Sequence, residues 1–175
     1  PLLPGFLHAP GNAHEQAEVG TVYAVGLGQV DQDQADEKLK AALDYLHQPG
    51  RAIATYGCSF GGKESMQATL LAPEKIAATI VAYCRMETDV EKLKTLQGPV
   101  LAIYAQQERN WPQKQEDFEV AMAFAGKDTQ GVGYDAAHGF TNPESPRYDA
   151  EADRAAWDTI VRFLEFSLGK NPPAE

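Results

Sequence analysis

Three residues of the types that act together in acyl-transfer chemistry follow three different apolar segments of this chain. Ser59 follows the first of these segments, Glu108 the second and His138 the third. A serine hydroxyl becomes a nucleophile when a histidine takes its proton, and a carboxylate orients that histidine. The order serine, acid, histidine is the one in which a G-x-S-x-G nucleophile is followed by its triad partners.

The predicted nucleophile is Ser59 rather than its neighbour Cys58. A G-x-S-x-G turn between a strand and a helix is so sharp that the backbone at the nucleophile is strained. We expect the positions two before and two after the nucleophile to pass too close to other backbone to carry a side chain. Ser59 has Gly57 and Gly61 at these positions, whereas Cys58 would have an aromatic residue at both.

The base and the acid are predicted from their order in the chain. His138 is the one histidine that follows Ser59, and it comes just after the last predicted strand, where the general base belongs. Glu108 follows the strand before it, so it is the predicted acid, and Asp135 is the alternative. A glutamate suffices here, because the acid must only accept the imidazole N–H and stabilise the imidazolium.

The elements that must position these residues alternate between strands and helices. The strands are continuous apolar runs, which is typical of a parallel sheet covered by helices on both faces. We therefore expect a single domain over residues 1–175 with a three-layer α/β fold and a mostly parallel sheet of five or six strands. The expected strands are 2–7, 21–27, 52–56, 77–83, 99–105 and 130–134, and the expected helices are 36–47, 63–71, 89–96, 113–125 and 150–168. In the last helix, the apolar spacing predicts that Trp157, Val161, Leu164 and Leu168 face the core.

The glycine turn resembles the nucleophile elbow of the dienelactone hydrolase family, within the α/β-hydrolase superfamily. That elbow reads G-x-C-x-G-G, and residues 57–62 read Gly-Cys-Ser-Phe-Gly-Gly, with serine where the family usually has cysteine. The segment from His138 through Gly139 and Phe140 is similar to the one around the family's catalytic histidine. The resemblance implies an α/β-hydrolase fold, abbreviated at its N-terminus, and a dienelactone hydrolase-like carboxylesterase that cleaves small esters or lactones with a Ser-His-Glu triad.

The first twenty residues match the family pattern least. The family has a His-Glu pair where this chain has His8 and Ala9, and its first two strands have no counterpart. An oxyanion hole should use the backbone N–H of Phe60 and a second donor from an earlier loop. We expect that second donor to be Ala9, with Gly11 as the alternative, because the proline between them has no N–H.

Three further residues are expected to line the substrate pocket. Tyr83 and Arg85 follow a strand at the same edge of the sheet, and Arg85 either binds a carboxylate or makes a structural ion pair. Trp111 lies three residues after Glu108, where it either forms a wall of the site or packs at the start of a helix. Cys84 is expected to be a buried core thiol.

The composition and charge of the chain limit the classes of function and partner that fit it. The chain has 175 residues, 43% of them hydrophobic, with a net charge of −10 and a pI near 4.8. An acidic surface disfavours nucleic acid and anionic lipid as partners, and no apolar run approaches the ~20 residues of a membrane span. With two cysteines and no metal-binding motif, we expect a reduced, cytoplasmic protein without metal or cofactor. It should act on a small molecule as a monomer or homodimer; the alternative is a catalytically weak or inactive relative that binds a small ligand or partner.

Overall fold

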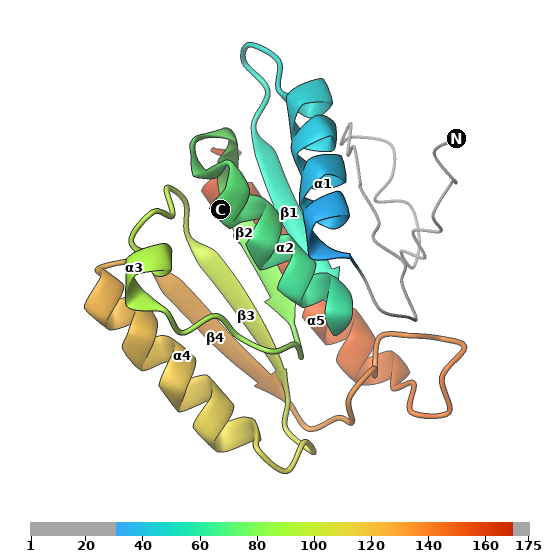
Figure 1. Cartoon of the computed structure of the whole chain (residues 1–175). Coiled ribbons are helices and arrows are strands. Elements are labelled where there is room, and N and C mark those ends of the chain that lie inside the picture. Colours follow the sequence, from blue (N-terminus) through green and yellow to red (C-terminus); the bar gives the residue numbers. More distant parts are fainter. Residues whose placement is uncertain (1–30, 170–175) are drawn as a thin grey trace, which may run out of the picture.

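The computed structural model describes residues 31–169, which form a parallel sheet between layers of helices (Figure 1). The sheet order is β1-β2-β3-β4, and every neighbouring pair is parallel. The strands are β1 (Ile53–Cys58), β2 (Ile76–Ala82), β3 (Val100–Ala105) and β4 (Thr129–Tyr134). The helices are α1 (Gln32–Leu46), α2 (Phe60–Leu71), α3 (Val90–Leu93), α4 (Trp111–Ala125) and α5 (Ala150–Ser167), with a 3₁₀ turn, η2 (Pro73–Lys75). The three-layer α/β fold is confirmed, and the expected strands 2–7 and 21–27 lie outside the described residues.

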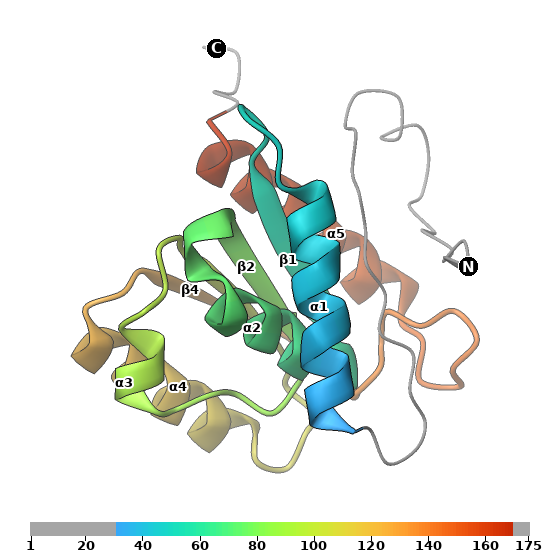
Figure 2. The same ribbon diagram turned by 45° about the horizontal axis from the view of Figure 1, so that its top comes forward.

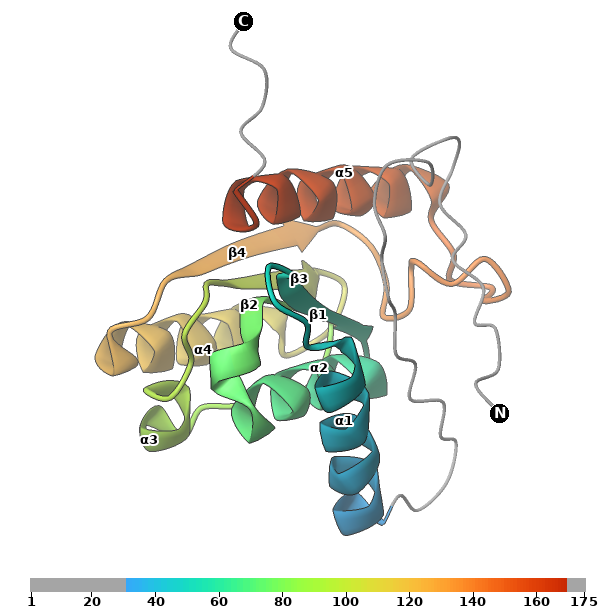
Figure 3. The ribbon, with the colours of Figure 1, turned by 90° about the horizontal axis from the view of Figure 1, so that it is seen from above.

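The strand order decides which helices share a face of the sheet. Each connection steps to the next strand in the same direction, and right-handed crossovers then place the connecting helices on one face. Figure 3 shows α2, α3 and α4 on that face and α5 on the other. α1 lies beside α2 near the β1 edge of the sheet, as Figure 2 also shows. Because all four strands are parallel, their carboxyl ends lie at the same edge of the sheet, where the residues that follow them can meet.

The two faces of the central strands β2 and β3 carry separate cores. Alternate side chains point to opposite faces of a strand, so a continuous apolar run fills both. The core toward α2, α3 and α4 includes Val81, Val100, Tyr104, Phe118 and Met122. The core toward α5 includes Ile80, Leu101, Ile103, Phe140 and Ile160. This double burial accounts for apolar strands without any polar alternation.

The inward face of α5 differs from the expected one. Its buried residues are Ala156, Ile160 and Phe163, whereas Trp157 and Leu164 are only partly buried against the same core. Val161 and Leu168 are also only partly buried. The prediction was wrong by one position around the helix, because it counted the large apolar residues and omitted Ala156, which allows the closest approach to the sheet.

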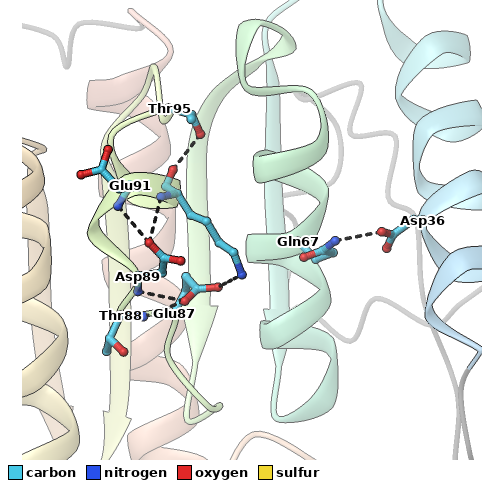
Figure 4. Close-up of polar contacts among 8 residues, drawn as sticks. Asp36, Gln67, Glu87, Thr88, Asp89, Glu91 and Thr95 are labelled. Carbon is cyan, nitrogen blue, oxygen red and sulfur yellow. Dashed lines mark hydrogen bonds and ion pairs between the residues drawn. The ribbon is translucent and has the colours of Figure 1, made fainter.

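α1 begins four residues before the expected start. The Asp31 side chain accepts hydrogen bonds from the backbone N–H groups of Asp33 and Gln34, so Asp31 is the N-cap. The first turn of α1 is polar, so the spacing of apolar residues does not indicate where the helix begins. Asp36 of α1 also accepts a hydrogen bond from the side chain of Gln67 of α2 at 2.9 Å, which joins the two helices (Figure 4).

Hydrogen bonds of Glu87 hold the segment between β2 and α3. Its carboxylate accepts from the backbone N–H groups of Thr88 and Asp89 and from Lys92 Nζ (Figure 4). Burial alone raises the pKa of Glu87, but these bonds and the lysine charge outweigh it, so the pKa lies below its usual value. Within residues 31–169, no helix is long and apolar enough to cross a membrane.

Candidate active site

Ser59 occupies a strained turn between β1 and α2. Its φ of 54° and ψ of −119° lie in a region that side-chain-bearing residues rarely adopt. The Ser59 N–H donates to Ala82 O at 2.9 Å, which ties the turn to the neighbouring strand. Strain of this kind persists only where the surrounding structure imposes it, and it is concentrated at functional sites. The turn lifts the Ser59 side chain to the carboxyl edge of the sheet.

Gly57 and Gly62 make this turn possible, and Gly61 does not. A Cβ on Gly57 would lie 1.9 Å from Gly61 O, and one on Gly62 would lie 2.7 Å from Cys84 Cβ. A Cβ on Gly61 would meet nothing within 4 Å. The expectation that Gly61 is too crowded for a side chain was therefore wrong. α2 already begins at Phe60, so Gly61 turns to open space and Gly62 is the residue that lies against Cys84, just after β2.

The structure brings the three predicted residues into one hydrogen-bonded chain. Ser59 Oγ lies 2.8 Å from His138 Nε2, and His138 Nδ1 lies 2.5 Å from Glu108 Oε1. A carboxylate accepts only, so His138 donates from Nδ1 and its Nε2 is left to accept from the serine hydroxyl. This tautomer is the one in which a histidine can take a proton from Ser59.

Backbone hydrogen bonds fasten the loop that carries the glutamate to the loop that carries the histidine. The N–H of Gln106 donates to Tyr134 O at 2.8 Å, and the N–H of Gln107 donates to Ala136 O at 3.2 Å. These bonds continue the β3–β4 pairing beyond the ends of the strands. The spacing of the glutamate and the histidine is thus set by main-chain atoms.

Asp135, the alternative acid, is exposed, and its carboxylate bonds Gln107 rather than His138. Its Oδ1 accepts from Gln107 Nε2 at 3.2 Å. The carboxylate that does bond the imidazole belongs to Glu108, whose side chain is 14% exposed. Of these two candidates, only Glu108 is in position to accept from the imidazole of His138.

Lys114, which the sequence argument did not single out, bonds the second carboxylate oxygen of Glu108. Burial raises the pKa of Glu108, whereas the hydrogen bonds and charges of Lys114 and His138 lower it. The lowering effects win, so the pKa of Glu108 lies below its ordinary value. Nothing in the spacing of a lysine six residues after a glutamate distinguishes this contact from a surface pair.

Tyr83 lies beneath the histidine loop. It is 3% exposed, and its ring meets the ring of His138 edge-on, with the centroids 5.2 Å apart. Its hydroxyl lies 2.5 Å from Thr141 Oγ1, and burial raises the pKa of the phenol well above its usual value. The backbone of Tyr83 is strained, with a φ of 36°. Tyr83 was expected to line the pocket. It is among the residues of the groove described next, and its ring and hydroxyl also pack against the histidine loop.

An open groove of about 540 Å³ lies over the three residues. Ser59, Phe60, Lys63, Tyr83, Cys84, Arg85, Met86, Thr88, Glu108, Asn110, Gln113, Lys114, Asp117 and His138 line it. Arg85 is thus an exposed residue of this groove. Trp111 is absent from this lining; it packs partly buried against the core under α4 and donates to Gln115 at 3.2 Å. Trp111 thus packs at the helix start, the second of its two expected positions.

Of the expected oxyanion donors, Phe60 lies within the described residues. Phe60 is the first residue of α2, and the first N–H groups of a helix have no partner within it. Its backbone donor is therefore available beside Ser59. Ala9, the expected second donor, and its alternative Gly11 lie outside the described residues.

Among the described residues, the hydrogen-bond partners of the two thiols do not include His138. The Cys58 Sγ lies 3.0 Å from the hydroxyl of Tyr56 and 3.8 Å from Thr141 Oγ1. Cys84 is buried, as expected, and burial raises its pKa to about 12. A thiol with a raised pKa is a poor nucleophile near neutral pH. The turn therefore presents the hydroxyl of Ser59, not a thiol, to His138.

Comparison with known proteins finds a matching family model and a curated relative, both with the names of hydrolases. The sequence model of the dienelactone hydrolase family matches residues 2–168, so it extends over residues 2–20, where the resemblance in motifs is weakest. A protein of Saccharolobus solfataricus named "Putative carboxymethylenebutenolidase" is 29% identical over 125 residues, which cover 70% of this chain and 48% of that protein. The chain thus spans about half the length of this curated relative.

Solved structures share the fold at lower identity. The crystal structure of a dienelactone hydrolase-like promiscuous phosphotriesterase from metagenomic libraries gives a TM-score of 0.66 at 21% identity, covering 78% of this chain and 62% of that one. A Pyrococcus horikoshii acylaminoacyl peptidase gives a TM-score of 0.60 at 16% identity, covering 79% of this chain and 29% of that one. At these identities the likeness concerns the arrangement of strands and helices.

Proposed function

The chain belongs to the dienelactone hydrolase family, and from this premise we propose that it is a serine hydrolase of small carboxylic esters or lactones. The observation that carries the proposal is the hydrogen-bonded chain from Ser59 through His138 to Glu108. The strained conformation of Ser59 supports it, because such a turn exposes a nucleophile at the top of a sheet. Family membership alone would leave the nucleophile open, since the family usually has cysteine there.

The proposed reaction proceeds through an acyl-serine. His138 Nε2 takes the hydroxyl proton as Ser59 Oγ attacks the carbonyl carbon, and the N–H of Phe60 stabilises the oxyanion. His138 returns the proton to the leaving alkoxide, which leaves the acyl group on Ser59. A water molecule, deprotonated by His138, then attacks the acyl carbon. The bond from that carbon to Ser59 Oγ breaks, His138 returns the proton to Oγ, and the carboxylic acid is released. Glu108 accepts the Nδ1–H bond throughout and stabilises the imidazolium.

A fluorophosphonate probe tests the nucleophile directly. We expect the wild-type chain to displace fluoride and become labelled at Ser59, and the Ser59→Ala chain to stay unlabelled, as read by intact-protein mass spectrometry. Cys58→Ala is the matched control and should label like wild type, because the partners of its thiol are Tyr56 and Thr141 rather than the imidazole. A wild-type chain that does not react would support the alternative, a binding module with the same fold.

We further propose that Arg85 meets a negatively charged part of the substrate. It is exposed and lines the groove over Ser59, and a guanidinium binds a carboxylate in a bidentate manner. Arg85→Gln should raise KM for a succinate half-ester by about tenfold, as expected for loss of an exposed charge-assisted contact, and leave the neutral butyrate ester unaffected. Equal effects on both esters would count against a carboxylate contact.

A further inference from the structure

The two carboxylate oxygens of Glu108 have different partners. Oε1 lies against His138 Nδ1, and Oε2 is bonded by Lys114 Nζ from α4. The side chains of Lys114 and Glu108 are 16% and 14% exposed, so the ion pair is largely shielded from water. A shielded pair with both oxygens bonded holds a carboxylate far more firmly than an exposed pair does.

A glutamate in this place needs such a second contact more than an aspartate would. Its side chain has one more rotatable bond, so more rotamer freedom must be lost when it is held in one orientation. The backbone of the loop is fixed by the bonds to β4 described above, but those bonds do not fix the carboxylate. Lys114 is the group that fixes the far oxygen and so turns Oε1 toward the imidazole.

The position of Lys114 in its helix is unfavourable for helix stability. It is the fourth residue of α4, near the positive end of the helix dipole, where a cation is disfavoured. The first turn of α4 holds no acidic residue that would offset it. Its contact with Glu108 therefore explains a lysine here better than the helix itself does.

We propose that Lys114 is a positioning residue of this site, which keeps the Glu108 carboxylate ionised and turned toward His138. The inference rests on the proposed function, in which Glu108 orients the histidine. Lys114 would not touch the reacting atoms and would act through Glu108 alone. The role goes beyond a three-residue site, because it assigns the orientation of the acid to a fourth side chain.

The electrostatic surroundings agree with this assignment. The ionisable side chains that line the groove or pack against this pair are Lys63, Tyr83, Cys84, Arg85, Asp117 and His138. Of these groups and Lys114, the two that form hydrogen bonds to Glu108 are Lys114 and His138. Burial raises the pKa of Glu108, and Lys114 contributes the largest of the effects that lower it. Removal of Lys114 should therefore raise the pKa of Glu108.

Two variants separate the charge of the lysine from its bulk. Lys114→Met keeps most of the length of the side chain and removes its charge. We expect kcat/KM at the plateau of the pH profile to fall by about 10- to 100-fold, as for a misplaced catalytic group. The acidic limb of its pH profile should move to higher pH, because the Glu108 carboxylate takes up a proton more easily once the lysine that lowers its pKa is gone. Lys114→Arg keeps the charge and should restore the position of the limb. Lys75→Met removes a more exposed ion pair, with Asp44, away from the groove and should change neither quantity.

A carboxyl titration provides a readout that does not depend on turnover. With ¹³C-labelled glutamate, the Glu108 signal should titrate at higher pH in Lys114→Met than in wild type and Lys114→Arg. The inference is overturned if Lys114→Met keeps the wild-type titration of Glu108. A wild-type chain without turnover or labelling would overturn the proposed hydrolase instead, and the same titration would still show whether Lys114 controls Glu108. An active wild type with an unchanged Lys114→Met pH profile would overturn the positioning role alone.

Discussion

Replacing either Ser59 or His138 by alanine is expected to lower kcat/KM for an activated acetyl ester by about 10⁴-fold or more. The serine supplies the attacking oxygen and the histidine removes its proton, and the two atoms lie 2.8 Å apart. Groups that act as one unit give strongly non-additive losses. The double variant Ser59→Ala/His138→Ala should therefore lose no more activity than either single variant. Initial rates corrected for background hydrolysis would measure all three chains.

A second histidine provides the matched control for this set. His47 is exposed at the C-terminal end of α1, where its backbone N–H donates to Leu43 O, so His47→Ala should keep the wild-type rate. Losses that add in the double variant would mean that serine and histidine act in separate steps. A His138→Ala chain within tenfold of wild type would remove His138 from the proposed role of general base.

The second large effect concerns folding. Gly57→Ala should lower the free energy of unfolding by about 3–5 kcal/mol, at or above the upper end of ordinary overpacking. The added Cβ would lie 1.9 Å from Gly61 O, a backbone atom that cannot move without breaking the elbow. Urea unfolding followed by tryptophan fluorescence measures the change in midpoint.

Gly61 is the matched control, because it lies in the same turn and has open space around its Cα. Gly61→Ala should leave stability unchanged or raise it by up to about 1 kcal/mol, since alanine favours a helix and restricts the unfolded chain. Equal losses for Gly57→Ala and Gly61→Ala would contradict the packing difference between the two glycines.

The sheet could be predicted because its strands are buried on both faces. Runs such as those of β2 and β3 contain no polar alternation, and only a parallel sheet covered by helices buries such runs completely. The ends of helices were less predictable. The start of α1 depends on the side chain of Asp31, a local contact that apolar spacing does not report. The inward face of α5 depends on an alanine, which carries little hydrophobic signal.

The site was predictable where the chain order and the backbone constrain it. The glycine two residues before Ser59 selects it over Cys58, and the order of the triad then selects Glu108 and His138. The contacts of side chains were not predictable in the same way. Lys114 comes from a helix whose start had been expected two residues later, and Tyr83 turns under the histidine loop only because its backbone adopts a positive φ.

The backbone bonds between the glutamate and histidine loops bear on how this site can change over evolution. Because main-chain atoms make these bonds, a substitution at Gln106 or Gln107 leaves their donors in place. Substitutions there by residues other than proline should therefore preserve the distance between Glu108 and His138. These two positions can thus drift in sequence while main-chain atoms keep the proposed acid and base at one spacing.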